Sequence, residues 1–321
     1  MKMTDMKTIN IAGYSIEFLL NDYFGINIKA TKEEIIDAAI NKAYNDATMR
    51  NALLQKNEKV KNKDGNDEYQ KLYKNTENVR KECNKQAKKI CVGVLKWFVT
   101  YLQREYFDKN EYDELHKSVC NILVAGGHAN NLDFMGYDNV YDENLESKKQ
   151  DKNVGKFYEL DKMHQPYFTI GNAQKWVNMT MKNLYILRGI FEKELEFIDK
   201  WEPVLHIPID NFILYGAYRR IEDIKKNNEK VNKKCGEDVD SDYLLTCIKQ
   251  VNKKESYYIK TKKEDKYVAW SRLQEYDDYN KIQKVLKFLA GDYESPIKWE
   301  CEVWLYSAKL MKDKEQVISI K

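Results

Sequence analysis

Apolar residues recur at helical spacing in several separate stretches of the chain, and each such stretch predicts a helix. The first helix is predicted over 32–49, because Thr31-Lys32-Glu33-Glu34 forms a capping box and apolar residues follow at helical intervals. Two further patterns, at 90–107 and 111–124, place an apolar stripe along each predicted helix. We expect these helices to supply the core of the first half of the chain.

The second half of the chain shows helical patterns of its own. They predict helices over 172–188, 211–226 and 279–289. Charged residues dominate 227–268, but the patch Tyr257-Tyr258-Ile259 within it is typical of a strand and indicates an insertion or a hairpin. Only four prolines and thirteen glycines occur in 321 residues, which favours long helices. The predicted fold class is therefore mainly α.

A polar stretch separates the two halves. Gly126-Gly127-His128 is predicted to end the helical pattern of the first half, and residues 136–165 are polar with little periodicity. We therefore predict an N-terminal helical region at 1–135, a loop at 136–165 and a second helical region at 166–321. The second region is the one expected to carry the chemistry, with the insertion at about 227–268.

Composition bears on compartment and partners. No stretch approaches the roughly 20 consecutive apolar residues that a membrane span needs. The N-terminus has Lys2 and Lys7 but neither the apolar region nor the cleavage site of a signal peptide. We therefore expect a cytoplasmic protein with no membrane partner. The net charge of +3 arises from 54 basic and 51 acidic residues, so overall charge alone does not indicate nucleic-acid binding.

Cysteine and histidine spacing gives no sign of a metal site or another cofactor. A zinc or iron–sulfur site would lead us to expect a Cys-x-x-Cys pair, and the six cysteines include none. We interpret them as core thiols. They are Cys83, Cys91, Cys120, Cys235, Cys247 and Cys301. No two of His128, His164 and His206 show metal-ligand spacing, and we expect these histidines to be structural or exposed.

The helix predicted at 172–188 carries a lysine near its start. Lys175 follows Gly171, which allows a tight backbone turn, and Lys182 lies two turns further along the same helix. A helix N-terminus and partial burial both favour the neutral, nucleophilic form of an amine. Lys175, expected in the first turn, is therefore a candidate nucleophile, although an early-helix lysine is more often a surface residue.

A carboxylate is predicted at the start of the next helix. The sequence His206-Ile207-Pro208-Ile209-Asp210-Asn211 precedes an apolar run at 212–214, which predicts Asp210 as the N-cap. Backbone N–H groups would then hold its carboxylate. An aspartate at an N-cap is usually structural, so the interpretation depends on the order and spacing of several features together.

This order of features resembles the helix-hairpin-helix glycosylase superfamily. A glycine-led helix with an early lysine is followed 35 residues later by a Pro-x-Asp helix start. The nearest likeness is to the archaeal GO glycosylases, whose lysine helix carries a second lysine two turns later, as Lys175 and Lys182 do. The segment from Pro296 to Trp304 is similar to the closing helix of those enzymes. The usual Gly-x-Gly hairpin is reduced to Gly171, and no iron–sulfur cysteines follow.

The resemblance implies a helical glycosylase architecture with an additional N-terminal region, and it assigns roles to residues. Asp210 would stabilise the positive charge that develops on the sugar, and Lys175 would attack the sugar and form a Schiff base. The flipped base would be held by aromatic side chains. The expected pocket residues are Trp176, Phe168, Tyr215, Trp270 and Trp304. The expected DNA-binding residues are Gly171, Gln174, Lys182, Arg219 and Arg220.

The expected partner is double-stranded DNA containing a modified base, bound by a monomer, in DNA repair or in antiviral defence. The excised base stays open between oxidised guanine, uracil and a glucosylated cytosine of phage DNA. Whether the enzyme also cleaves the strand stays open too, because Asp210 could act with water alone. The alternatives are a non-catalytic DNA-binding module and a protein-interaction subunit of a defence system.

Overall fold

The chain is mainly helical in the computed structural model, which confirms the predicted fold class at that level. The structure describes residues 11–46, 77–104, 108–134, 168–227, 246–251, 256–261, 267–291, 293 and 295–319. The loop predicted at 136–165 lies outside these residues, as do His164 and Cys235. The same holds for much of the segment predicted as an insertion.

The first half of the chain supplies four α-helices and one π-helical turn among the described residues. They are α1 (Ile11–Leu19), η1 (Leu20–Phe24), α2 (Lys32–Asp46), α5 (Glu77–Leu102) and α6 (Lys109–Phe134). The predicted capping box of α2 is confirmed. The Thr31 N–H donates to Glu34 Oε2 at 2.7 Å, and the Glu34 N–H donates to Thr31 Oγ1 at 3.3 Å.

The prediction that Gly126-Gly127-His128 ends a helix is wrong, because α6 continues to Phe134. A glycine inside a helix costs only about 1 kcal/mol relative to alanine. It ends a helix reliably when it adopts a left-handed cap. Among the glycines that the structure describes, Gly25 alone has a left-handed backbone, with φ of 72°. Gly126 and Gly127 therefore weaken α6 without ending it.

The second half of the chain supplies the remaining helices and a small sheet. The helical elements are α9 (Ile170–Arg188), α10 (Phe197–Trp201), η2 (Glu202–Val204), α11 (Asn211–Asn227), η4 (Trp270–Arg272), α13 (Tyr276–Leu289) and α14 (Pro296–Ser319). The strands are β1 (Ile248–Val251), β2 (Ser256–Lys260) and β3 (Tyr267–Ala269). They form an antiparallel sheet in the order β1-β2-β3. The strand predicted from the aromatic patch is confirmed as β2.

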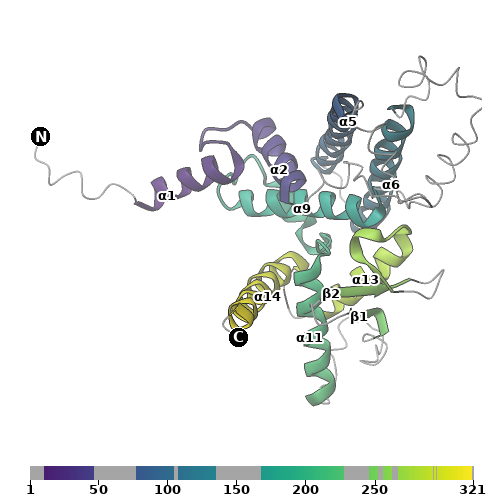
Figure 1. The fold of residues 1–321 in the computed structure, drawn as a ribbon. Helices are drawn as coiled ribbons and strands as arrows, with labels where there is room; N and C mark the ends of the chain where they lie inside the picture. Colours follow the sequence, from purple (N-terminus) through teal and green to yellow (C-terminus); the bar gives the residue numbers. More distant parts are fainter. Residues whose placement is uncertain are drawn as a thin grey trace, which may run out of the picture.

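Helix α9 lies at the centre of the molecule, with α2, α5 and α6 on one side and α11, α13 and α14 on the other (Figure 1). Side chains from α9 bond directly to the backbone of α2. Trp176 Nε1 donates to Ile40 O at 3.1 Å, and Asn183 Nδ2 donates to Ala39 O at 3.1 Å. Most residues of α9 are buried, including both polar and apolar ones. Its polar side chains therefore need partners inside the protein.

One hydrophobic core joins the two halves of the described chain. Its members come from α2, α5 and α6 as well as from α9, α11, α13 and α14. The sheet contributes through Tyr257 of β2, whose ring packs against those of Tyr215 and Tyr218 on α11. Burial of this continuous apolar surface provides the main stabilisation of the fold.

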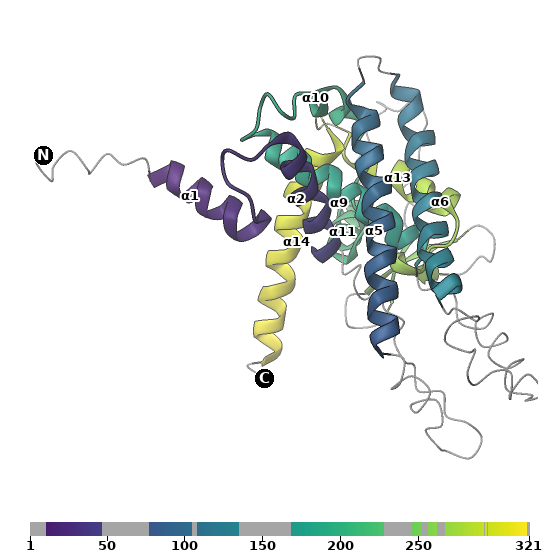
Figure 2. The same cartoon turned by 90° about the horizontal axis from the view of Figure 1, so that it is seen from above.

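Helix α1 extends away from the body of the molecule, as the two orthogonal views show (Figures 1 and 2). Several of its apolar side chains are exposed, among them Tyr14, Phe18 and Leu19. Within the described part of the chain, no helix combines the length and the apolar character that crossing a membrane requires.

Candidate active site

Helices α9 and α11 bring Lys175 and Asp210 together. Lys175 Nζ lies 3.6 Å from Asp210 Oδ2, and the two side chains are 11% and 14% exposed. The separation is longer than a direct hydrogen bond, so neither group is locked onto the other. The pair is therefore enclosed by protein on most sides and still reachable from solvent.

Asp210 uses its two carboxylate oxygens differently. The Ile213 N–H donates to Oδ1 at 3.0 Å, and α11 begins at the next residue, Asn211. Asp210 is therefore the N-cap of α11, as predicted. This bond holds the carboxylate at a fixed angle to the helix axis and turns Oδ2 toward Lys175.

Lys175 lies in the second turn of α9 and not in the first. The helix begins at Ile170, and its N-cap is Thr169, whose Oγ1 accepts from the Asn172 N–H at 3.2 Å. The ammonium of Lys175 lies over the indole ring of Trp270, 4.7 Å from the ring centroid. This cation–π contact gives Lys175 a second fixed neighbour besides Asp210.

A short segment, Trp270–Leu273, crosses the start of α9, and we call it the strap. Thr169 Oγ1 donates to Ser271 O at 2.8 Å, and the Gly171 N–H donates to Leu273 O at 3.1 Å. A Cβ atom on Gly171 would lie 1.9 Å from the Trp270 carbonyl oxygen. Gly171 is therefore required for close backbone approach. The structure does not support its predicted role in phosphate binding, because its N–H is already used.

Gly171→Ala is expected to lower the free energy of unfolding by about 1–3 kcal/mol or more, because the strap must move to admit the methyl group. The matched control is Gly93→Ala in α5, where a Cβ meets nothing within 4 Å. Alanine is the better helix former there by about 1 kcal/mol, so the control should gain stability. Chemical denaturation of both variants measures these changes. Equal effects in the two variants would contradict the close approach of the strap.

Lys182 forms a second, tighter pair with Glu300 of α14. Its Nζ lies 2.8 Å from Oε1 and 2.7 Å from Oε2, and the Glu300 side chain is 1% exposed. Burial raises the pKa of Glu300, and Lys182 opposes that shift. Lys182 also lies over Trp304, 5.7 Å from its ring centroid. The predicted role of Lys182 in DNA binding is therefore not supported, because a buried carboxylate already occupies its ammonium.

Three of the five predicted pocket residues lie in the core. Trp176 and Phe168 are fully buried, and Trp176 packs on Tyr44 of α2. Tyr215 is also buried, beside Tyr257. None of the three presents a face to a base, which corrects their assignment. Trp270 and Trp304 are partly exposed and each lies beside one of the two lysine–carboxylate pairs.

Of the other predicted DNA-binding residues, one is buried and two are exposed. Gln174 is fully buried, and its amide donates to Gly171 O at 2.8 Å, so it is not available to DNA. Arg219 and Arg220 are exposed on α11. Arg219 forms an ion pair with Glu222 at 3.3 Å. Exposed pairs of this kind contribute little to stability, and the arginine can exchange its partner readily.

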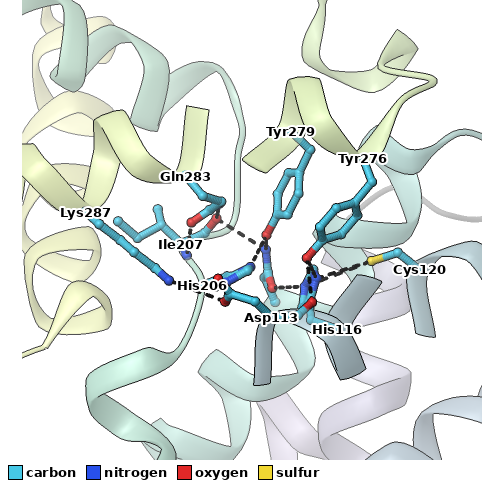
Figure 3. Close-up of polar contacts among 10 residues, drawn as sticks. Asp113, His116, Cys120, His206, Ile207, Tyr276, Tyr279, Gln283 and Lys287 are labelled. Atoms are coloured by element: carbon cyan, nitrogen blue, oxygen red, sulfur yellow. Dashed lines mark hydrogen bonds and ion pairs between the residues drawn. The ribbon is translucent and has the colours of Figure 1, made fainter. Parts of the chain in front are cut away.

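A largely buried polar network contains a histidine, His116, that sequence reasoning did not single out (Figure 3). His116 Nε2 is 2.8 Å from Asn178 Oδ1, and His116 Nδ1 is 2.8 Å from Tyr276 Oη. His206 lies between Asp113 and Tyr279, at 2.7 Å from each. His116 was detectable in principle, because it falls four residues from both Tyr112 and Cys120 on the apolar face of α6.

The proton positions in the network follow from its fixed acceptors. An ionised Asp113 can only accept, so His206 Nε2 carries the proton and Nδ1 accepts from the Tyr279 hydroxyl. Burial lowers the pKa of His206 to about 4 and lowers the pKa of His116 well below its usual value. The hydrogen bond from His206 holds the pKa of Asp113 well below its usual range. Both imidazoles are therefore neutral at neutral pH.

The order Tyr279, His206, Asp113 has the form of a catalytic triad, but access rules out that role. Tyr279 and His206 are fully buried, and burial raises the pKa of Tyr279 well above its usual value. A nucleophile must reach its substrate and lose its proton, and Tyr279 meets neither condition. The network is therefore structural, and the partly exposed pair of Lys175 and Asp210 is the candidate active site.

The cysteines are placed largely as predicted. Cys91, Cys120 and Cys247 are buried free thiols, whereas Cys301 is partly exposed. The side chain of Cys83 lies outside the described residues. Within the parts of the chain that the structure describes, no three or more His, Cys, Asp or Glu side chains are grouped so as to hold a metal ion.

Comparison with family models, curated proteins and solved structures finds no match to this chain. Its chemistry must therefore be argued from its own residues. An amine and a carboxylate in contact, beside an indole ring and partly open to solvent, can attack and stabilise an electrophilic carbon. The carboxylate can also accept the proton that the amine loses.

Proposed function

We propose that this chain is a DNA glycosylase, in which Lys175 and Asp210 break the N-glycosidic bond of a modified base. One observation carries the proposal. Two residues 35 positions apart, assigned from sequence to the nucleophile and the carboxylate of such an enzyme, lie 3.6 Å apart in a partly exposed site. For residues 166–321 we propose the architecture of the helix-hairpin-helix glycosylases.

The chemistry requires both groups on the same sugar. As the bond from C1′ to the base breaks, positive charge develops on the sugar, and the Asp210 carboxylate stabilises it. The Lys175 ammonium first loses a proton by way of Asp210 to the departing base, which also takes the electrons of the broken bond, and the free amine then forms a bond to C1′. Asp210 takes the proton that the amine loses. Opening of the sugar ring converts the product into a Schiff base on Lys175.

The partly exposed tryptophans are the proposed walls for the flipped base. Trp270 is held by the strap beside Lys175, and Trp304 packs edge-on against Phe212, two residues after Asp210. A base that leaves the stack needs an aromatic surface to replace its lost stacking. Arg219 and Arg220, on the helix that Asp210 caps, are the proposed phosphate contacts.

The geometry bears on the choice between an enzyme and a non-catalytic DNA-binding module. A binding module has no need to hold Lys175 and Asp210 in contact and could place them on separate surfaces. The contrast with the second pair is also informative. The two lysine side chains are similarly exposed, but Glu300 is 1% exposed and lies 2.7 Å from Lys182, whereas Asp210 is 14% exposed and lies 3.6 Å from Lys175.

Borohydride reduction in the presence of DNA tests the nucleophile. Reduction of a Schiff base would attach the DNA covalently to the protein, and Lys175→Met should abolish that attachment while keeping an unbranched chain over Trp270. Lys96→Met is the matched control, since Lys96 forms a more exposed pair with Asp37 at 2.8 Å. The Lys96→Met protein should become attached to the DNA as the parent does. Base release without trapping would assign the reaction to Asp210 and water. Trapping that persists in Lys175→Met would reject Lys175.

A further inference from the structure

The backbone that leads into Asp210 is held by three buried side-chain amides. The Ile207 N–H donates to Gln283 Oε1 at 3.0 Å, and Gln283 Nε2 donates to Ile207 O at 2.6 Å (Figure 3). Asn178 Nδ2 also donates to Ile207 O, at 3.3 Å. The Ile209 N–H forms a long hydrogen bond of 3.5 Å to Gln174 Oε1. The polar groups of this stretch are thus bound by side chains and not by a neighbouring strand.

Two of these amides belong to the helix that carries Lys175. Gln174 precedes Lys175 directly, and Asn178 lies one turn later, with its Nδ2 donating to Gln174 Oε1 at 3.0 Å. Gln174 Nε2 is anchored in turn to Gly171 O at 2.8 Å. The position of Asp210 is therefore set relative to α9 by the same short segment that presents the lysine.

The orientation of both amides is determined by their surroundings. The Ile207 carbonyl can only accept, so Asn178 must turn its nitrogen toward Ile207, and its Oδ1 then accepts from His116 Nε2. Gln174 must present its nitrogen to the Gly171 carbonyl, so its oxygen faces Ile209. A fully satisfied buried network of this kind restricts the backbone to one arrangement more strictly than apolar packing does.

We propose that Gln174 and Asn178 are positioning residues, which hold the Ile207–Ile209 backbone against α9 and thereby keep the carboxylate of Asp210 at Lys175. The activity part of this inference rests on the proposed function. The positional part rests on the hydrogen bonds alone. Small displacements matter in such a site, because an error of about 1 Å between reacting groups can cost roughly 100-fold in rate.

The matched variants are Asn178→Leu and Asn183→Leu. Both remove a buried amide from α9, but Asn183 bonds to Ala39 O of α2 and takes no part in holding the backbone before Asp210. The lysines are reductively methylated with ¹³C-formaldehyde, and the Lys175 resonance is assigned by its absence in Lys175→Met. Asp210→Asn supplies the reference spectrum for a lysine without its carboxylate.

In Asn178→Leu the Lys175 resonance should shift toward its position in Asp210→Asn, and in Asn183→Leu it should stay at the parent position. Gln174→Met should behave like Asn178→Leu and serves as the second variant if Asn178→Leu does not fold. Base release should fall about 10- to 100-fold in kcat with little change in KM. A parent-like Lys175 resonance in both positioning variants would overturn the proposal. The spectra remain decisive even for a protein that releases no base.

Discussion

Asp210→Asn is expected to slow base release by about 100- to 1000-fold, the loss typical of removing one group that stabilises charge in a transition state. Asparagine caps a helix about as well as aspartate, so the bond from the Ile213 N–H to the side-chain oxygen should survive. The negative charge beside Lys175 is then the main feature lost. The free energy of unfolding should change by only about 1 kcal/mol, an ordinary value for a single substitution.

The matched control for this prediction is Asp37→Asn. Asp37 also pairs with a lysine, Lys96, but both side chains are nearly half exposed, and the pair joins α2 to α5. Its loss should cost at most about 1 kcal/mol and leave the rate unchanged. Single-turnover rates and denaturation curves of the three proteins give both quantities. A similar loss of rate in both variants would show that the effect is not specific to the proposed site.

A fall in pH is expected to remove the stability that the neutral side chain of His206 contributes. The folded state holds His206 neutral, with its pKa lowered to about 4 by burial, whereas an exposed histidine titrates near its ordinary value of 6.5. Between these two values the unfolded state binds more protons, so stability is fully present above about pH 6.5 and is lost as the pH falls toward 4. His206 alone accounts for about 3 kcal/mol over this range.

Other groups in the network do not obscure this effect. The pKa of His116 is also lowered, so His116 adds to the loss of stability in acid. Burial raises the pKa of Cys120, Tyr276 and Tyr279, and these groups stay neutral throughout. Asp113 has a lowered pKa, so its contribution is lost only at more acid pH, below its ordinary value of 3.8.

His206→Gln keeps a donor for Asp113 and an acceptor for Tyr279 without a titrating ring. Urea denaturation across about pH 7 to 4.5 gives the free energy of unfolding as a function of pH. The slope of this curve should be smaller in the variant than in the parent, by an amount that corresponds to the binding of up to about one proton. An equally steep change in the parent and in His206→Gln would mean that His206 is not held neutral in the folded protein.

Features set by neighbouring residues were predictable from sequence. The capping box of α2 and the N-cap at Asp210 each need only a side-chain oxygen and backbone N–H groups within three residues. Helices α2, α9, α11 and α13 were predictable because their apolar periodicity matches the faces that are buried, whereas α1 and α10 were not predicted. Boundaries were less secure at Gly126-Gly127, because helix continuation depends on backbone conformation and not on residue type alone.

Features set by distant partners were not predictable in the same way. Lys175 and Lys182 look alike on the helix, yet one meets an accessible aspartate and the other a buried glutamate from α14. Trp176 and Trp270 look alike as aromatic walls, yet one bonds to Ile40 O in the core and the other is carried to Lys175 by the strap. The residue type determines which chemistry a side chain can perform, and the tertiary packing determines whether that side chain is exposed.

Lys175 and Asp210, the two residues to which the resemblance gives catalytic roles, lie 3.6 Å apart, but the resemblance gives no account of what supports them. Gly171 is a glycine because the strap crosses it, and Gln174 faces inward toward the backbone before Asp210. Neither role follows from a DNA-contact interpretation. Both show that the start of α9 is used mainly to build the proposed site and not to bind phosphate.

The most direct test of the proposed function is base release from a panel of DNAs containing oxidised guanine, uracil, alkylated bases or the glucosylated cytosine of phage DNA. Abasic sites are counted for the parent, Asp210→Asn and Asp37→Asn. We expect abasic sites from one substrate, which disappear in Asp210→Asn and persist in Asp37→Asn. Absence of release from every DNA, or release that survives in Asp210→Asn, would contradict the proposed role of the Lys175 and Asp210 pair.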